Sequence, residues 1–243
     1  MKSLPVRIVA ALSGFGWLAF GYVDLIGAWE FGSVLEASWG AFFSVVVAVP
    51  FFFVALRPLH AGPAIAQLWV ALAALVVGVA LSLEAPALLH ILLLGFGVAL
   101  VSFTEGAERW IPRNLEPSWL VLAVALAGTP WLVHAYKMVD LNRQVLPGPS
   151  DTGGVDHHSV QAAFALAVLA LAVLAGLWFR GRRFLATCAG ASSAFVGVVA
   201  WAFPDAEAGL ATGWAVAATS WGVALTACAW LPPSETAVRT RRA

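Results

Sequence analysis

The sequence predicts an all-α, polytopic integral membrane protein: a bundle of eight transmembrane helices with both termini on the inner side. Hydrophobic residues make up 61% of the 243 residues and charged residues only 11%, whereas a soluble domain carries about a quarter charged residues. The mean hydropathy is +0.89. Long apolar runs favour hydrocarbon and satisfy their backbone polar groups as helices. We expect one membrane domain, residues 1–243, located in the cell membrane.

Eight apolar runs have about the length needed to cross a bilayer. The predicted helices are residues 8–29, 39–56, 64–83, 87–103, 118–138, 158–179, 184–203 and 213–231. The first run is too long for a signal-peptide core and lacks a clean cleavage site, so we expect it to be retained. Only residues 84–86 separate the third and fourth runs, and Pro86 leaves a re-entrant hairpin as an alternative. Thr129 and Pro130 predict a kink in the fifth helix.

The basic residues give an independent test of this threading. Positively charged loops resist translocation and stay on the cytoplasmic side. With the N-terminus inside, the predicted inner segments hold eleven of the 13 basic residues, and only Lys137 and Arg143 fall outside. The inner residues are Lys2, Arg7, Arg57, Arg109, Arg113, Arg180, Arg182, Arg183, Arg239, Arg241 and Arg242. The preference for Arg over Lys is typical of a GC-rich bacterial genome.

The predicted outer face is acidic and carries one long polar stretch. Its acidic residues, interpreted first as solvated loop ends, are Glu30, Glu36, Glu84, Asp140, Asp151, Asp156, Asp205 and Glu207. The polar stretch runs from His134 to Gln161 and includes a predicted outer loop at about 139–157. That loop is too short to form a soluble domain with its own core.

Ionisable groups on four predicted helices fall at a similar depth in the outer leaflet. Such groups are costly near hydrocarbon and tend to face a cavity or pair with one another. Carboxylates and imidazoles together can bind a metal ion, relay protons or hold a cationic ligand. The candidate residues for ligand binding or proton relay are Asp24, His90, His134, Asp156, His157, His158 and Gln161.

Four of these candidates also have a purely structural interpretation. His134 can cap the last turns of its helix, His157 and His158 sit at a membrane boundary where polar residues are ordinary, and Asp156 suits an N-cap of the sixth helix. Three tryptophans lie mid-helix, where we expect them to pack the bundle or face lipid: Trp17, Trp69 and Trp221.

Three classes of function follow from these groups. We favour binding or transport of a small ligand or ion through an outward-facing polar pocket. One alternative is a membrane redox or metal enzyme with His90 and His134 as metal ligands, for example around a haem. The other is a non-catalytic assembly subunit whose outer loop docks a protein partner. No recognised catalytic motif is present, no cofactor is firmly implied, and homo-oligomerisation stays open. Nucleic-acid binding has no support, because no basic face with interleaved aromatics exists.

Small residues recur four apart in the last two predicted helices. Gly190 precedes Ala194 and Gly222 precedes Thr226 at this spacing, which lets helix backbones approach closely. The run 190–195 resembles, over a turn or two, the serine motif of rhomboid intramembrane proteases. That family activates its serine with a later histidine, and none follows His158 here, so we interpret Ser192 and Ser193 as packing residues. Cys188 and Cys228 are expected to be free thiols.

Overall fold

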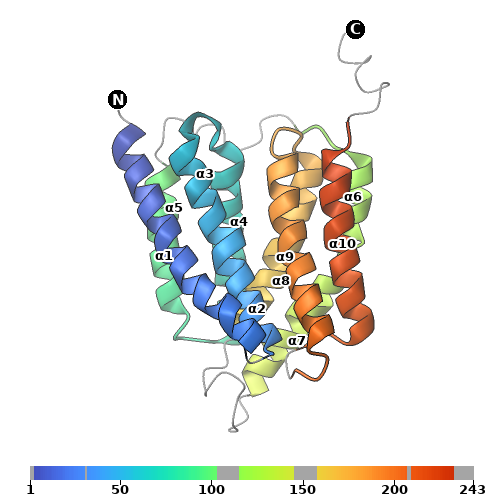
Figure 1. Ribbon diagram of the computed structural model, residues 1–243. Helices are drawn as coiled ribbons and strands as arrows, with labels where there is room; N and C mark the ends of the chain where they lie inside the picture. Colours follow the sequence, from blue (N-terminus) through green and yellow to red (C-terminus); the bar gives the residue numbers. More distant parts are fainter. Residues whose placement is uncertain (1–2, 31, 103–114, 145–157, 207–208, 233–243) are drawn as a thin grey trace.

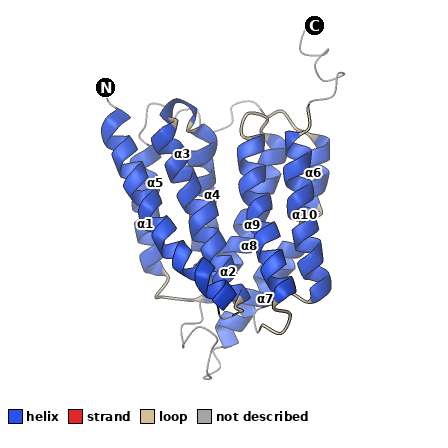
Figure 2. Ribbon diagram, in the orientation of Figure 1, coloured by secondary structure: helices blue, strands red, loops and turns tan. Residues whose placement is uncertain are grey.

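The computed structural model describes residues 3–30, 32–102, 115–144, 158–206 and 209–232. Within these ranges every regular element is a helix (Figure 2). The elements are α1 (Ser3–Glu30), α2 (Val34–Ala41), the π-helix η1 (Phe42–Ala48), α3 (Val49–Leu56), the 3-10 turn η2 (Pro58–His60), α4 (Gly62–Ser82), α5 (Leu88–Ser102), α6 (Trp119–Leu126), α7 (Pro130–Gln144), α8 (His158–Leu177), α9 (Arg182–Ala202) and α10 (Thr212–Trp230).

The helices run up and down side by side, and α1 begins at the same end of the bundle at which α10 stops (Figure 1). Six helical stretches in the described part of the chain are long and apolar enough to cross a membrane. These are Leu4–Glu30, Val34–Leu56, Gly62–Ser82, Trp119–Gln144, His158–Leu177 and Arg182–Ala202. Large hydrophobic side chains such as Leu92, Phe96 and Val133 are exposed on the outside of the bundle. This confirms the predicted all-helical class, and the six long apolar helices support the prediction of a membrane protein.

Two predicted boundaries are wrong because polar side chains extend helices beyond the apolar runs. The second helix begins at Val34 rather than 39, where Ser33 accepts a hydrogen bond from the backbone N–H of Glu36 as an N-cap. The outer loop predicted from residue 139 is helical to Gln144. There Asn142 donates to the carbonyl of Ser82 and Arg143 to that of Leu81, which caps the end of α4.

The helix from Val34 to Leu56 contains a π-helical segment at Phe42–Ala48, just before Pro50. Proline has no N–H. An N–H at position 50 would donate to the carbonyl of Val46 in an α-helix or to that of Val45 in a π-helix. Both carbonyls therefore lack this donor. The buried side chain of Gln67 on α4 supplies both bonds, with Nε2 3.3 Å from the Val45 oxygen and 3.0 Å from the Val46 oxygen. One side-chain amide thus completes the backbone hydrogen bonding of a neighbouring helix.

The predicted fifth helix, residues 118–138, is two helices, α6 and α7, joined by the turn at 127–129. The break agrees with the kink expected at Thr129 and Pro130. In the tightened turn Gly128 donates to the carbonyl of Ala125 instead of that of Val124. The indole N–H of Trp221 on α10 donates to the freed Val124 carbonyl at 2.6 Å. The break is therefore stabilised by a contact between helices.

The small residues of α9 and α10 form the tight helix contact that their spacing predicts. A Cβ added at Gly222 would lie 2.8 Å from the backbone nitrogen of Ala194, and one at Gly197 2.7 Å from the carbonyl oxygen of Ala215. Ser193 is buried and donates to the carbonyl of Ala218. Ser192 is also buried, so both serines lie in the packed interior. Cys188 and Cys228 are free cysteines.

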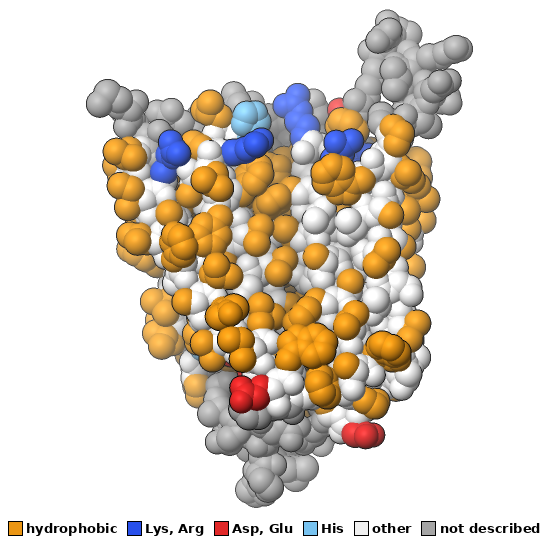
Figure 3. Space-filling view, viewed as in Figure 1, with side chains coloured by type: hydrophobic (Ala, Val, Ile, Leu, Met, Phe, Trp, Pro, Cys, Tyr) orange, Lys and Arg blue, Asp and Glu red, His pale blue; other side chains and the backbone are white. Residues whose placement is uncertain are grey.

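Charged residues separate toward the two ends of the bundle (Figure 3). The end at which α1 begins, which we call the arginine end, carries Arg7, Arg57, Arg180, Arg182 and Arg183, together with Glu116. The opposite, carboxylate end carries Glu30, Glu84, Asp140 and Asp205, together with Lys137 and Arg143.

Two of these arginines donate hydrogen bonds to carbonyls near the C-terminal ends of helices. At the arginine end Arg7 donates to the carbonyl of Ala55 at 2.7 Å, near the end of α3. Arg182 donates to the carbonyl of Ala175 at 3.4 Å, in the last turn of α8, and to that of Glu116 at 3.2 Å. Cationic groups at helix C-termini complement the helix dipole.

Candidate functional site

His134 lies in the first half of α7 and lines a cavity of about 60 Å³ between the α6–α7 break and α10. Its side chain is 7% exposed. Its Nε2 is a buried atom that has no hydrogen-bond partner among the described residues. We call this space the His134 cavity. It is lined by Ala127, Gly128, Pro130, Trp131, His134, Leu210, Trp214, Ala217, Ala218 and Trp221.

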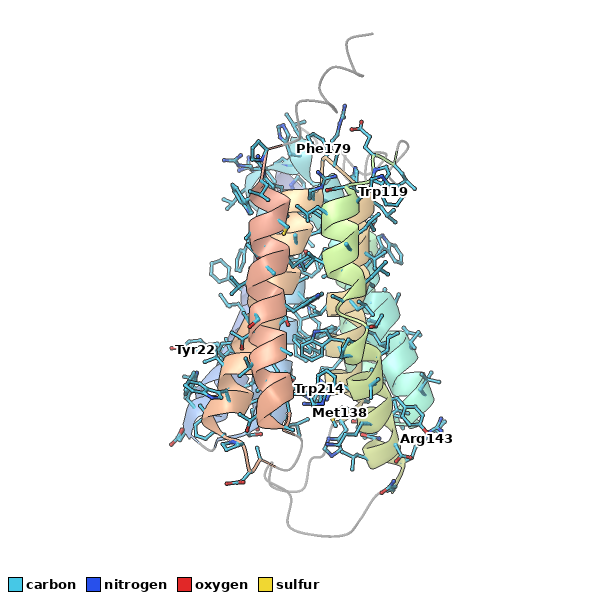
Figure 4. The ribbon with its side chains drawn as sticks, turned by 90° about the vertical axis from the view of Figure 1, so that its right-hand side faces the viewer. Tyr22, Trp119, Met138, Arg143, Phe179 and Trp214 are labelled. Carbon is cyan, nitrogen blue, oxygen red and sulfur yellow. The ribbon has the colours of Figure 1, made fainter. Side chains whose placement is uncertain are left out.

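The cavity owes its shape to the broken helix and to three indole rings. Gly128 lies against Trp221, and a Cβ added there would come 2.7 Å from an indole ring carbon, so only glycine leaves room for that ring. Trp131 is buried and meets His134 edge-on, with ring centroids 5.6 Å apart. Trp214 and Trp221 are seven residues apart on α10 and thus share one helix face. Figure 4 shows Trp214 on α10 opposite the lower part of α7.

The start of α8, which packs against α7, carries two further polar side chains. His158 and Gln161 are buried, and their spacing places them on one face of α8. His158 and Lys137 lie close enough to His134 to interact with it electrostatically. The neighbouring Ser159 donates a hydrogen bond to Glu84, which ties α8 to the turn between α4 and α5.

Asp24 and His90 belong to a second polar group, on α1, α2 and α5. The carboxyl group of Asp24 makes a side-chain hydrogen-bonding contact with Glu36 of α2. The imidazole of His90 is surrounded by four aromatic rings whose centroids lie 5.4–6.5 Å away: those of Trp17, Phe20, Trp39 and Phe43. Phe20, which contacts His90, and Asp24, which contacts Glu36, lie one helical turn apart on the same face of α1.

The structure therefore arranges the predicted site residues in two groups. Helix α4 packs against both α5, which carries His90, and α7, which carries His134. Asp156 and His157 lie outside the described residues. Within the described ranges, no group of three or more His, Cys, Asp or Glu side chains could hold a metal ion. His134 lies ten residues before the end of α7 rather than in its last turns, because that helix continues to Gln144.

Sequence reasoning missed several residues of these groups. Glu36 was interpreted as a solvated loop end, but it contacts Asp24. Trp221 was expected to pack the bundle or face lipid. It packs against α6, lines the cavity and donates to the Val124 carbonyl. One sequence signal for the cavity was available: a helix-breaking Gly-Thr-Pro run in the fifth predicted helix, together with two tryptophans seven residues apart in the last one. The Ser-x-x-Glu pattern at Ser33 and Glu36 was a second signal, typical of a helix start.

Comparison with protein-family models, with curated proteins and with solved structures finds no match to this chain.

Proposed function

We propose that the chain crosses the membrane eight times, with both termini and the arginine end in the cytoplasm. Six stretches already have the required length. The remaining two segments are α5, with 15 residues, and α10, with 19, which lie alongside them in the bundle (Figure 1). The gathering of arginines at one end supports this orientation, since basic residues accumulate on the cytoplasmic side.

This threading predicts that Arg180 and Asp205 face opposite compartments. We expect a single cysteine introduced as Asp205→Cys, in a Cys188→Ala, Cys228→Ala background, to react with a membrane-impermeant maleimide in intact cells. The matching Arg180→Cys variant should react only after the membrane is permeabilised. Both positions are exposed in the structure, so burial would not protect either one. Labelling of both from the same side would overturn the threading.

We further propose that the protein binds a small ligand or ion in the carboxylate half of the bundle, as a binding protein or transporter, with the His134 cavity as its site. The observation that carries this proposal is the cavity itself, lined by a buried imidazole beside a helix break. Buried ionisable groups at membrane depth are expensive and mark ligand or ion pathways. Discontinuous helices are a recurring feature of such sites in transporters.

This proposal predicts a stabilisation that depends on His134. Purified protein would be heated with members of a defined panel, each at saturation: monovalent and divalent cations, amino acids, sugars, organic amines and long-chain alcohols. A ligand at a hundred times its dissociation constant stabilises the folded state by about 2.7 kcal/mol. We expect at least one class to raise the unfolding midpoint of the natural protein and to lose that effect in His134→Phe.

The matched control is His60→Phe, because His60 is exposed in η2 at the arginine end. This variant should keep the full ligand response. If no class stabilises the protein, or if His134→Phe responds like His60→Phe, the cavity is not the site.

A further inference from the structure

We infer that the His134 cavity takes the head group of a neutral, lipid-soluble amphiphile, which reaches it sideways from the hydrocarbon between α7 and α10. This inference rests on the proposed function and specifies the class of ligand and its route. The position of the cavity mouth, the size of the cavity and the chemistry of its lining all favour such a ligand.

The mouth of the cavity is apolar and faces outward. Three lining residues are exposed, namely Ala127, Trp214 and Ala217, and Trp214 is 54% exposed. The floor is buried and includes His134 and Trp221. None of the lining residues carries a full charge, and Pro130 and Leu210 complete the apolar border. A mouth of this composition lies more favourably against lipid chains than against water.

The packing of α10 leaves this side open. α10 packs chiefly against α9 and, through Trp221, against α6. Trp214, further toward the carboxylate end, stands beside the space between α10 and α7 (Figure 4). The cavity is therefore reached from the lateral surface of the bundle.

The size of the cavity restricts what can fit. A cavity of about 150 Å³ holds one benzene molecule, and this one measures about 60 Å³. It has room for a few non-hydrogen atoms, or for a few waters. A larger ligand must therefore leave most of its body outside the mouth, where the surroundings are hydrocarbon. A small head group with an apolar tail meets this requirement.

The lining selects a neutral head group that forms hydrogen bonds. Nε2 of His134 is buried without a partner among the described residues, and burying such a group unpaired is costly. A neutral imidazole nitrogen either donates or accepts, so a hydroxyl or carbonyl group suits it. A full charge brought into this apolar space would pay a large desolvation penalty. The indole rings add flat apolar surface for the atoms next to the head group.

A pair of photoreactive probes tests this inference in phosphatidylcholine vesicles that contain the full chain. One probe is a long-chain alcohol with a diazirine next to its hydroxyl group; the other is the same alkyl diazirine without the hydroxyl. We expect the alcohol to label the peptides around 131–134 or 214–221 about fivefold more than the hydrocarbon does, the effect of one net hydrogen bond. Excess unlabelled alcohol should compete with this labelling.

Two variants locate the effect. His134→Phe should remove the preference for the alcohol, and Ala217→Phe at the mouth should reduce labelling by both probes. Ala227→Phe is the matched control for the second variant, because Ala227 is an exposed residue of α10 distant from the cavity. It should label like the natural protein.

Equal labelling by the two probes, or labelling unchanged by Ala217→Phe, would overturn the inference. A water-soluble compound that stabilises the protein through His134, without specific alcohol labelling, would also overturn it but leave the proposed function standing. Failure of both experiments would remove the proposed function as well.

Discussion

The substitution Gly222→Ala is expected to destabilise the protein by about 1–3 kcal/mol or more, the range for overpacking a close contact. The added Cβ would lie 2.8 Å from the backbone nitrogen of Ala194 and would also press on the carbonyl of Gly190. Backbone atoms cannot move aside as a flexible side chain can, so α9 and α10 must separate. Since these helices pack closely along much of their length, the separation loses contacts beyond the substituted position.

The predicted loss of stability is opposite to the usual effect of replacing glycine by alanine in a helix. Alanine stabilises a helix by about 1 kcal/mol relative to glycine. At a site where the added Cβ meets no other atoms, the same substitution is therefore neutral or stabilising. Gly16 on α1 is such a site, because an added Cβ would meet nothing within 4 Å. Unfolding by sodium dodecyl sulfate in mixed micelles, followed by tryptophan fluorescence, should separate Gly222→Ala from Gly16→Ala. Equal stabilities for the two variants would contradict the close contact.

The substitution Gln67→Leu is expected to destabilise the protein by about 2–4 kcal/mol, since a buried group left unpaired costs about 1–3 kcal/mol. Leucine cannot donate a hydrogen bond, so the carbonyls of Val45 and Val46 lose the donor that Gln67 provides. In the same unfolding measurement, the loss should shrink when Pro50 is replaced by alanine. Pro50→Ala restores an N–H that can serve one of the two carbonyls. The double-mutant cycle should therefore show a coupling of about 1 kcal/mol or more between positions 50 and 67.

Ser192→Ala is the matched control for Gln67→Leu. Ser192 is equally buried, but its hydroxyl has no partner among the described residues. Removing it should change stability by less than about 1 kcal/mol. A coupling near zero between positions 50 and 67 would mean that the Gln67 amide does not compensate for the proline.

Local patterns determined a large part of the fold. Apolar runs predicted the membrane class and the approximate position of each helix, because a helix is the structure in which a chain satisfies its own backbone in lipid. The Thr129–Pro130 break and the small-residue spacing around Gly190 and Gly222 were likewise predictable, because proline and glycine act through the backbone of their own segment. Helix ends were less predictable: α7 reaches Gln144 because its polar side chains cap α4.

The arrangement of the candidate site was predicted only in part. Depth along each helix follows from sequence position, so Asp24, His90 and His134 could be assigned to one half of the bundle. Their division into two groups could not be predicted, because depth does not indicate which way a side chain faces or which helix stands beside it. Nothing in the fifth predicted helix shows that Trp221, almost a hundred residues later, will bond the Val124 carbonyl.

The amino-acid sequence by itself determined that this chain folds as apolar helices with arginines toward one end, because hydropathy and charge act on each segment separately. Only the tertiary structure decided which helices are neighbours, and with them the pairing of Asp24 with Glu36, the support of Pro50 by Gln67 and the cavity at His134. These features depend on contacts between distant segments, and in a uniformly apolar chain the hydrophobic pattern does not distinguish one helix partner from another.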